Sequence, residues 1–174
     1  MKLTRPGAIV IAVLICTNVS SLRAAPPPDW AVELSPAFDA YYAGDMQQAQ
    51  RRVAQVLADF REPAIQRQAR AFEAMLLMRG ALRDEWLAGR ARFAQIVADE
   101  PAMADNPELL LAMGMAHRGL DESSASIAAM HSAVDGFLFQ RRSERALAAA
   151  VELARGWATH TEWELGVPGL VAPR

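Results

Sequence analysis

Apolar residues recur along this chain at intervals of three and four, which is the spacing of one face of an α-helix. Residues 46–60 show it best, with Met46, Ala49, Val53, Val56 and Phe60 on one side and polar residues on the other. Similar faces follow in Trp86, Gly89, Phe93 and Ile96, and in Ile127, Met130, Val134 and Phe137. No segment alternates at period two as a half-buried strand would. The pattern therefore predicts an all-α chain.

Capping residues and helix breakers divide this pattern into seven expected helices. Ser35-Pro36 and Asn106-Pro107 are typical helix starts, because Ser or Asn caps free backbone N–H groups and proline lacks one. Asp45 is a further expected cap, directly after the Gly44 that ends a short first helix. Ser143 is an expected cap of a seventh, alanine-rich helix, which carries Leu147, Val151 and Ala154 and is expected to end near Trp157.

The second helices of three successive pairs align in one register. Ala49-Val53-Val56 aligns with Gly89-Phe93-Ile96, 40 residues later, and with Ser126-Met130-Ala133, a further 37 residues on. Each triad begins with a small residue, which lets two helices approach closely. One such pair cannot bury both of its faces, so we expect the pairs to stack on one another.

In this register the chain resembles the tetratricopeptide repeat family, most closely over Leu110 to Ala133. Gly114 occupies the family's small position midway along a first helix, and Ser126, Met130 and Ala133 occupy its small, aromatic and small positions in the second. Spacings of 37 and 40 exceed the family's usual length of about 34 residues, and the alternative is an irregular helical bundle. The resemblance covers residues 36–134. It implies a short right-handed α-solenoid of about three units plus a C-terminal helix, within a domain of residues 35–158.

The same resemblance implies a binding surface. In this family the first helices of the pairs build a concave face that commonly binds an extended peptide or a partner helix. Carried over to the third unit, this places Glu108, Leu111, Met115 and Arg118 in a partner-binding groove. The implied function is an adaptor or scaffold that binds another protein without catalysis.

Residues typical of catalysis or metal binding are scattered. The three histidines, His117, His131 and His160, are not spaced as helical metal ligands, and no phosphate loop or nucleophile elbow is present. We therefore expect no enzyme, no cofactor and no metal site. Two alternatives stay open: a structural subunit that docks through its apolar last helix, Ala146 to Ala158, and a helical enzyme with an unrecognised site.

The N-terminus has the layout of a secretory signal peptide. Basic residues precede the apolar run Ala8–Cys16, and small residues follow it. We expect residues 1–24 to be cleaved after Ala24, leaving a Pro-rich leader at 25–34 and a coil tail at 159–174. The protein would then reside in the periplasm or outside a bacterial cell. The alternatives are an uncleaved anchor and a lipid on Cys16, either of which would attach the protein to the membrane.

Removal of this segment changes the charge of the chain. It takes 3 of the 18 basic residues and none of the 20 acidic ones, so the mature part carries a formal charge of −5. An acidic domain with dispersed arginines argues against nucleic acid as a partner. The only cysteine is also lost, so stability must come from packing. We expect a protein or peptide partner, with a homo-oligomer as a further alternative.

Overall fold

The computed structural model describes residues 30–165, and their side chains as far as residue 158. This part of the chain contains only helices, so the all-α prediction is confirmed for it. The elements are η1 (Val32–Leu34), α1 (Ser35–Tyr42), α2 (Met46–Asp59), α3 (Pro63–Met78), α4 (Arg83–Asp99), η2 (Pro101–Asp105), α5 (Pro107–Gly119), α6 (Ser123–Phe139) and α7 (Ser143–Leu165), where η marks a short 3-10 helix. The expected signal segment, residues 1–24, and most of the leader lie outside the described residues.

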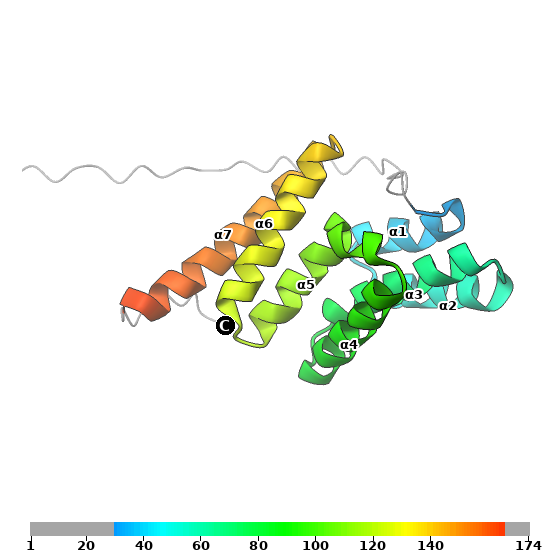
Figure 1. Ribbon diagram of the computed structural model, residues 1–174, viewed down its shortest axis with the longest axis horizontal. Coiled ribbons are helices and arrows are strands. Elements are labelled where there is room, and N and C mark those ends of the chain that lie inside the picture. Colours follow the sequence, from blue (N-terminus) through cyan, green and yellow to red (C-terminus); the bar gives the residue numbers. More distant parts are fainter. Residues whose placement is uncertain (1–29, 166–174) are drawn as a thin grey trace, which may run out of the picture.

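The helices pack in the order in which they occur. α1 packs on α2, α3 on α4, α5 on α6, and α6 on α7, while α3 also contacts α2 and α5 and so joins neighbouring pairs. Figure 1 shows α1 and α2 at one end of the molecule and α6 and α7 at the other, with α3, α4 and α5 between them. The expected stacking of sequential antiparallel pairs is therefore confirmed.

Two of the expected helix caps, Asp45 and Asn106, are confirmed, whereas Ser35 and Ser143 are each the first residue of a helix instead of its cap. The Asp45 carboxylate accepts a hydrogen bond from the Gln48 N–H at 2.9 Å, and the Asn106 side chain accepts one from the Glu108 N–H at 3.1 Å. Ser35 is not a cap: it is the first residue of α1, and its hydroxyl donates to the Val32 carbonyl at 2.6 Å. The reason is that η1 runs directly into α1, so its turn already supplies carbonyl partners at the helix start.

The larger of two hydrophobic clusters fills the space between α1, α2, α3 and α5. Its centre is aromatic, with the Phe38 and Phe72 rings edge to face at 4.5 Å and the Trp30 ring 5.1 Å from Phe38. Trp30 and Leu34 are buried, whereas Val32 is exposed. The end of the leader therefore belongs to the folded core. A smaller cluster joins α5, α6 and α7.

Small residues lie where the helices of a pair cross, as their register predicts. A Cβ atom added to Gly114 would lie 2.5 Å from Cγ of Met130, and the Ser126 hydroxyl donates to the Gly114 carbonyl at 2.8 Å. A Cβ atom on Gly89 would lie 2.8 Å from the backbone nitrogen of Met78. Any larger side chain at these positions would force α5 from α6, or α3 from α4.

The last helix differs from its predicted form in two ways. α7 continues to Leu165, so the expectation of coil from residue 159 is wrong for residues 159–165, a stretch with no helix-breaking Gly or Pro. Its buried side consists of small residues, including Ala146 and Ala149, while the larger Leu147 and Val151 are exposed. No helix in the described part of the chain is both long enough and apolar enough to cross a membrane.

Candidate functional site

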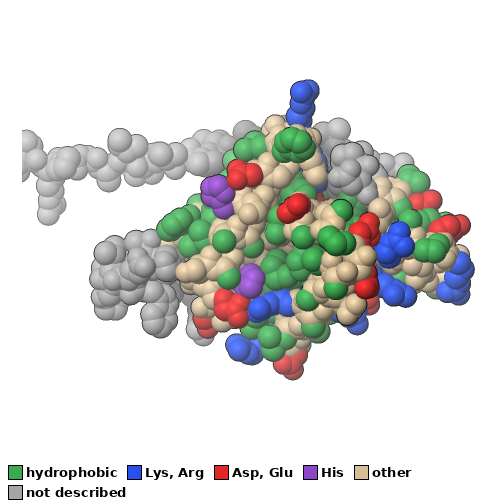
Figure 2. All heavy atoms as spheres, viewed as in Figure 1, with side chains coloured by type: hydrophobic (Ala, Val, Ile, Leu, Met, Phe, Trp, Pro, Cys, Tyr) green, Lys and Arg blue, Asp and Glu red, His purple; other side chains and the backbone are tan. Residues whose placement is uncertain are grey.

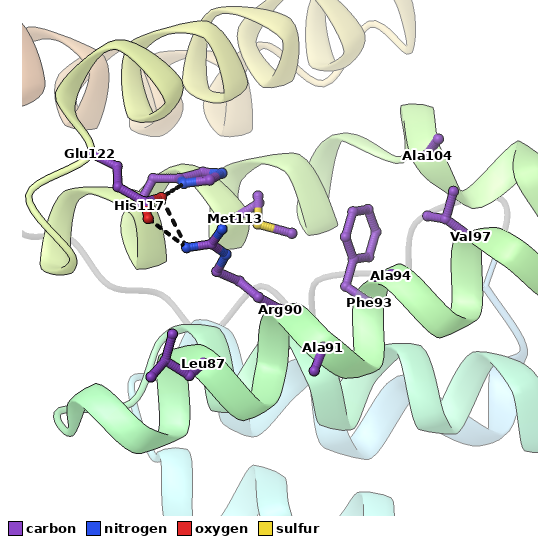
Figure 3. A pocket seen from close by; sticks show the side chains of 10 residues that line it. All are labelled: Leu87, Arg90, Ala91, Phe93, Ala94, Val97, Ala104, Met113, His117 and Glu122. Carbon is purple, nitrogen blue, oxygen red and sulfur yellow. Dashed lines mark hydrogen bonds and ion pairs between the residues drawn. The ribbon is translucent and has the colours of Figure 1, made fainter.

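An open groove lies between α4 and α5 and ends at the turn that leads into α6 (Figure 3). Its volume is about 770 Å³. Most of its lining is apolar, namely Leu87, Ala91, Phe93, Ala94, Val97, Ala104 and Met113; the polar members are Arg90, His117 and Glu122. Figure 2 shows apolar side chains in a hollow on this face of the molecule, with charged side chains and a histidine at one edge.

The groove exists because α4 packs more closely on α3 than on α5. Gly89 is buried against α3, and this close contact fixes the position of α4. Near its start, α4 meets α5 through the Trp86 ring, which lies against Gly119 and donates its indole N–H to the Gly80 carbonyl at 2.7 Å. Beyond its end, η2 forms the connection to α5 and buries Met103. The lining residues of α4 lie between these two points.

One end of the groove is a charged cluster from three elements. Arg90 of α4 donates to both carboxylate oxygens of Glu122, at 3.0 and 2.9 Å, and Nδ1 of His117 on α5 forms a short contact with the same carboxylate. Asp121 has a φ of +62°, a left-handed conformation that Asp tolerates better than most residues. This turn brings the Glu122 N–H to the His117 carbonyl at 2.9 Å and so places its side chain beside the imidazole.

The electrostatics of this cluster favour an ionised carboxylate. The hydrogen bond with His117, followed by those from Arg90, holds the pKa of Glu122 below its ordinary value of 4.5. Glu122 is therefore an anion at neutral pH, with Arg90 as its permanent counterion. The pair is solvent-exposed, so it contributes little to stability and stays available to a ligand.

Such a groove is suited to holding apolar side chains from another molecule. Phe93 and Met113 are half-buried, and Leu87 is 45% exposed. Met is unbranched and adapts its shape to a neighbour, which helps a surface accept irregular ligands. The charged end supplies donors and an acceptor that can orient a bound segment. Within the described residues, no group of three or more His, Cys, Asp or Glu side chains is placed to hold a metal ion.

The residues expected to bind a partner lie elsewhere, on the side of α5 that faces α7. Glu108 is fully buried and accepts hydrogen bonds from the Tyr42 hydroxyl at 2.7 Å, from Arg142 at 2.8 Å and from Arg145 at 3.0 Å. Burial alone would raise the pKa of Glu108, but Arg145, Tyr42 and Arg142 together lower it below 4.5. This buried anion joins α1, α5 and the start of α7.

The other three expected residues also contact the last two helices. Leu111 is buried in the smaller cluster, and Met115 packs against that cluster. Arg118 pairs with Glu152 of α7 at 2.8 Å. The structure therefore brings all four residues to the side of α5 that faces α6 and α7, where Glu108 and Leu111 are buried and Met115 and Arg118 are half-buried. Their binding to a partner stays a prediction, and contact with the buried Glu108 and Leu111 would require the neighbouring helices to move.

Sequence reasoning did not find the charged end of the groove. Arg90 lies 32 residues from Glu122, and no local pattern joins them. His117 and Glu122 are five residues apart across a turn, and without the turn geometry Glu122 looks like an acidic residue that complements the start of a helix. Of the groove residues, only Phe93 had a signal in the sequence, and its helical register indicated a packing residue.

An apolar floor, an open side and a charged end are the features that the groove presents. Surfaces that bind protein segments share them: an apolar centre with a polar rim. No family model, curated protein or solved structure matches this chain.

Proposed function

We propose that this protein is an exported protein-binding module, which holds an apolar segment of a partner in the groove between α4 and α5 and performs no catalysis. The observation that carries the proposal is the groove itself. It is large, open and apolar, and Arg90, His117 and Glu122 form a polar group at only one end. An open surface of this kind accepts side chains from a peptide or a helix that lies across its open side.

The expected ligand follows from the lining. One or two large apolar side chains would pack on Phe93 and Met113, and burial of each contributes about 1.5–3 kcal/mol. A polar group beside them would meet Arg90 or Glu122. This polar contact sets the direction of the bound segment more than its affinity, because the charges stay partly hydrated.

The proposal also includes the arrangement of the helix pairs as repeat units. The sequential pairs and their small crossing residues, Gly89, Gly114 and Ser126, support units of the tetratricopeptide type. We infer a short right-handed solenoid of three such units, with α7 as the C-terminal helix. This family binds partners by helical surfaces, which agrees with a binding role here.

The proposed location rests on the sequence of residues 1–24. Its basic start, apolar run and small residues at the end are those of a cleavable signal peptide. The protein would bind its partner in the periplasm or outside the cell. Sequencing the N-terminus of the exported protein tests this, and the expected first residue is Ala25.

A charged substitution in the groove tests the binding role. Ala94 is an exposed groove residue of α4, and Ala88 is exposed on the same helix but does not line the groove. Envelope extract is passed over the wild-type protein, Ala94→Arg and Ala88→Arg, and the retained proteins are quantified. We expect a protein that wild type and Ala88→Arg retain equally and that Ala94→Arg retains at least about tenfold less, because its guanidinium must enter apolar surroundings. Equal retention by all three would contradict the proposal.

A further inference from the structure

The last helix presents an apolar side to solvent. Leu147 is 67% exposed and Val151 is 44% exposed, and Ala148, Ala154 and Ala158 are exposed with them. The opposite side of α7 packs on α6 through Ala146 and Ala149. α7 is therefore apolar on both sides, which is typical of a helix that is buried on both sides.

The two ends of the stack differ in this respect. The exposed side of α2, at the first end, is mostly polar and includes Gln47, Gln50, Arg51, Arg52, Gln55 and Asp59. Stacked helical proteins end on polar outer faces, because an apolar face left in water favours association. α2 meets this requirement and α7 does not. Figure 1 shows that α7 lies at the end of the molecule farthest from α2, with α6 beside it.

The exposed side of α7 carries one negative and one positive charge, at opposite ends of a single stripe. Glu144, Ala148, Val151 and Arg155 are spaced by four, three and four residues, so they form one stripe, and all four are exposed. Among the side chains of this helix that the structure describes, Glu144 and Arg155 are the only exposed charged ones, and they lie at opposite ends of the stripe. Arg155 already pairs with the half-buried Glu152 at 2.6 Å, but the Arg155 side chain itself stays 66% exposed and can face a second molecule.

We propose that this stripe is the interface of a homodimer in which α7 of one copy packs antiparallel to α7 of the second. A twofold axis between residues 149 and 150 places Glu144 opposite Arg155 of the second copy, and Ala148 opposite Val151. Each small residue thus receives a larger one, and each charge meets its opposite. Such an interface is self-complementary, as twofold symmetry requires. None of the stripe residues lines the groove between α4 and α5.

A charge swap tests this register. The protein is expressed from its full coding sequence, and its dimer dissociation constant is measured by sedimentation equilibrium. Glu144→Arg and Arg155→Glu should each weaken the dimer by about tenfold, because each brings like charges together. The double variant restores opposite charges, and its dissociation constant should return to within about threefold of wild type. Val151→Arg, at the centre of the stripe, should weaken the dimer by at least about a hundredfold.

Two controls accompany these variants. Ala128→Arg changes an exposed residue of α6, and Ala94→Arg changes the groove, so both should leave the dimer unchanged. Because the substituted residues are exposed, the helix content by circular dichroism should match wild type throughout. A chain that stays monomeric at about 100 µM, where a micromolar dimer would assemble, overturns the proposal. So does a dimer that is insensitive to Val151→Arg, or a double variant as weak as the single ones. These outcomes leave the groove proposal intact, because the two surfaces share no residue.

Discussion

The contact between α5 and α6 and the contact between α4 and α5 are neighbours in the stack but differ in character. The first is closed: Gly114 meets Met130, and the buried Ser126 hydroxyl bonds to the Gly114 carbonyl. The second is closed near the start of α4, by Trp86, and opens into a groove of about 770 Å³ beyond it. The difference shows that neighbouring contacts in one stack can be either tightly closed by small residues or partly open, and the open one forms the groove.

The largest expected effect follows from filling the closed contact. Gly114→Trp places an indole where even a Cβ atom would lie 3.1 Å from the Ser126 carbonyl oxygen. α5 and α6 must separate, which should cost at least about 3 kcal/mol, near the upper end for overpacked cores. Thermal unfolding should show a melting temperature lower by roughly 10 °C. Ala125→Trp, at an exposed position of α6, is the matched control and should change little. Equal melting temperatures for the two variants would argue against the close crossing.

A second expected effect compares two carboxylates, one buried against α7 and one at the open groove. Glu108→Gln leaves Arg142 and Arg145 without their anion, and because these arginines retain 16% and 21% exposure, the expected loss is about 2 kcal/mol. Glu122→Gln removes an exposed partner of Arg90, whose charge water and salt already screen, so it should cost much less than Glu108→Gln. Chemical denaturation at pH 7 measures both. Equal losses would contradict the assignment of Glu108 as the structural anion.

The effect of Glu108 should also depend on pH. Folding lowers the pKa of this carboxyl below 4.5, so the unfolded chain binds its proton more tightly than the folded protein does. The stabilisation is complete above pH 4.5 and is lost as the pH falls through the lowered pKa. The difference in unfolding free energy between wild type and Glu108→Gln should therefore shrink in acid. A difference that stays constant down to pH 2 would show that the ionised form contributes nothing.

The smallest expected effect on stability belongs to the open groove. Ala94 is exposed, so Ala94→Arg should change the unfolding free energy by less than about 0.5 kcal/mol. A loss of partner binding by Ala94→Arg would then result from the changed groove surface and not from unfolding. A large loss of stability in denaturant titration would mean that α4 and α5 are in closer contact at Ala94 than the groove allows.

Features with a local signal could be predicted from the sequence. Local spacing, within a few helical turns, determines the helices, the Asp45 and Asn106 caps and the small residues Gly89 and Gly114. The periodicity of apolar residues along the sequence shows this spacing directly. The buried sides of most helices follow for the same reason, because their large apolar residues lie on one face. These predictions are confirmed by the structure.

Features that depend on distant residues could not be predicted in this way. Glu108 is buried because Arg142 and Arg145, 34 and 37 residues later, neutralise it. In α7, small residues such as Ala146 and Ala149 permit close packing on α6, so Leu147 and Val151 face outward although they are more hydrophobic. The groove likewise depends on where α3 holds α4. Which side chains are buried here depends on the size and charge of residues far away in the sequence. The hydrophobic periodicity of a single helix carries no information about those residues.

The central claim is that the groove between α4 and α5 receives a partner in the living cell. A photo-crosslinking amino acid placed at position 94, inside the groove, or at position 88, outside it on the same helix, tests this most directly. Illumination of intact cells should give a discrete crosslinked product from position 94 and none from position 88. The same products from both positions, or none from position 94, would contradict the account.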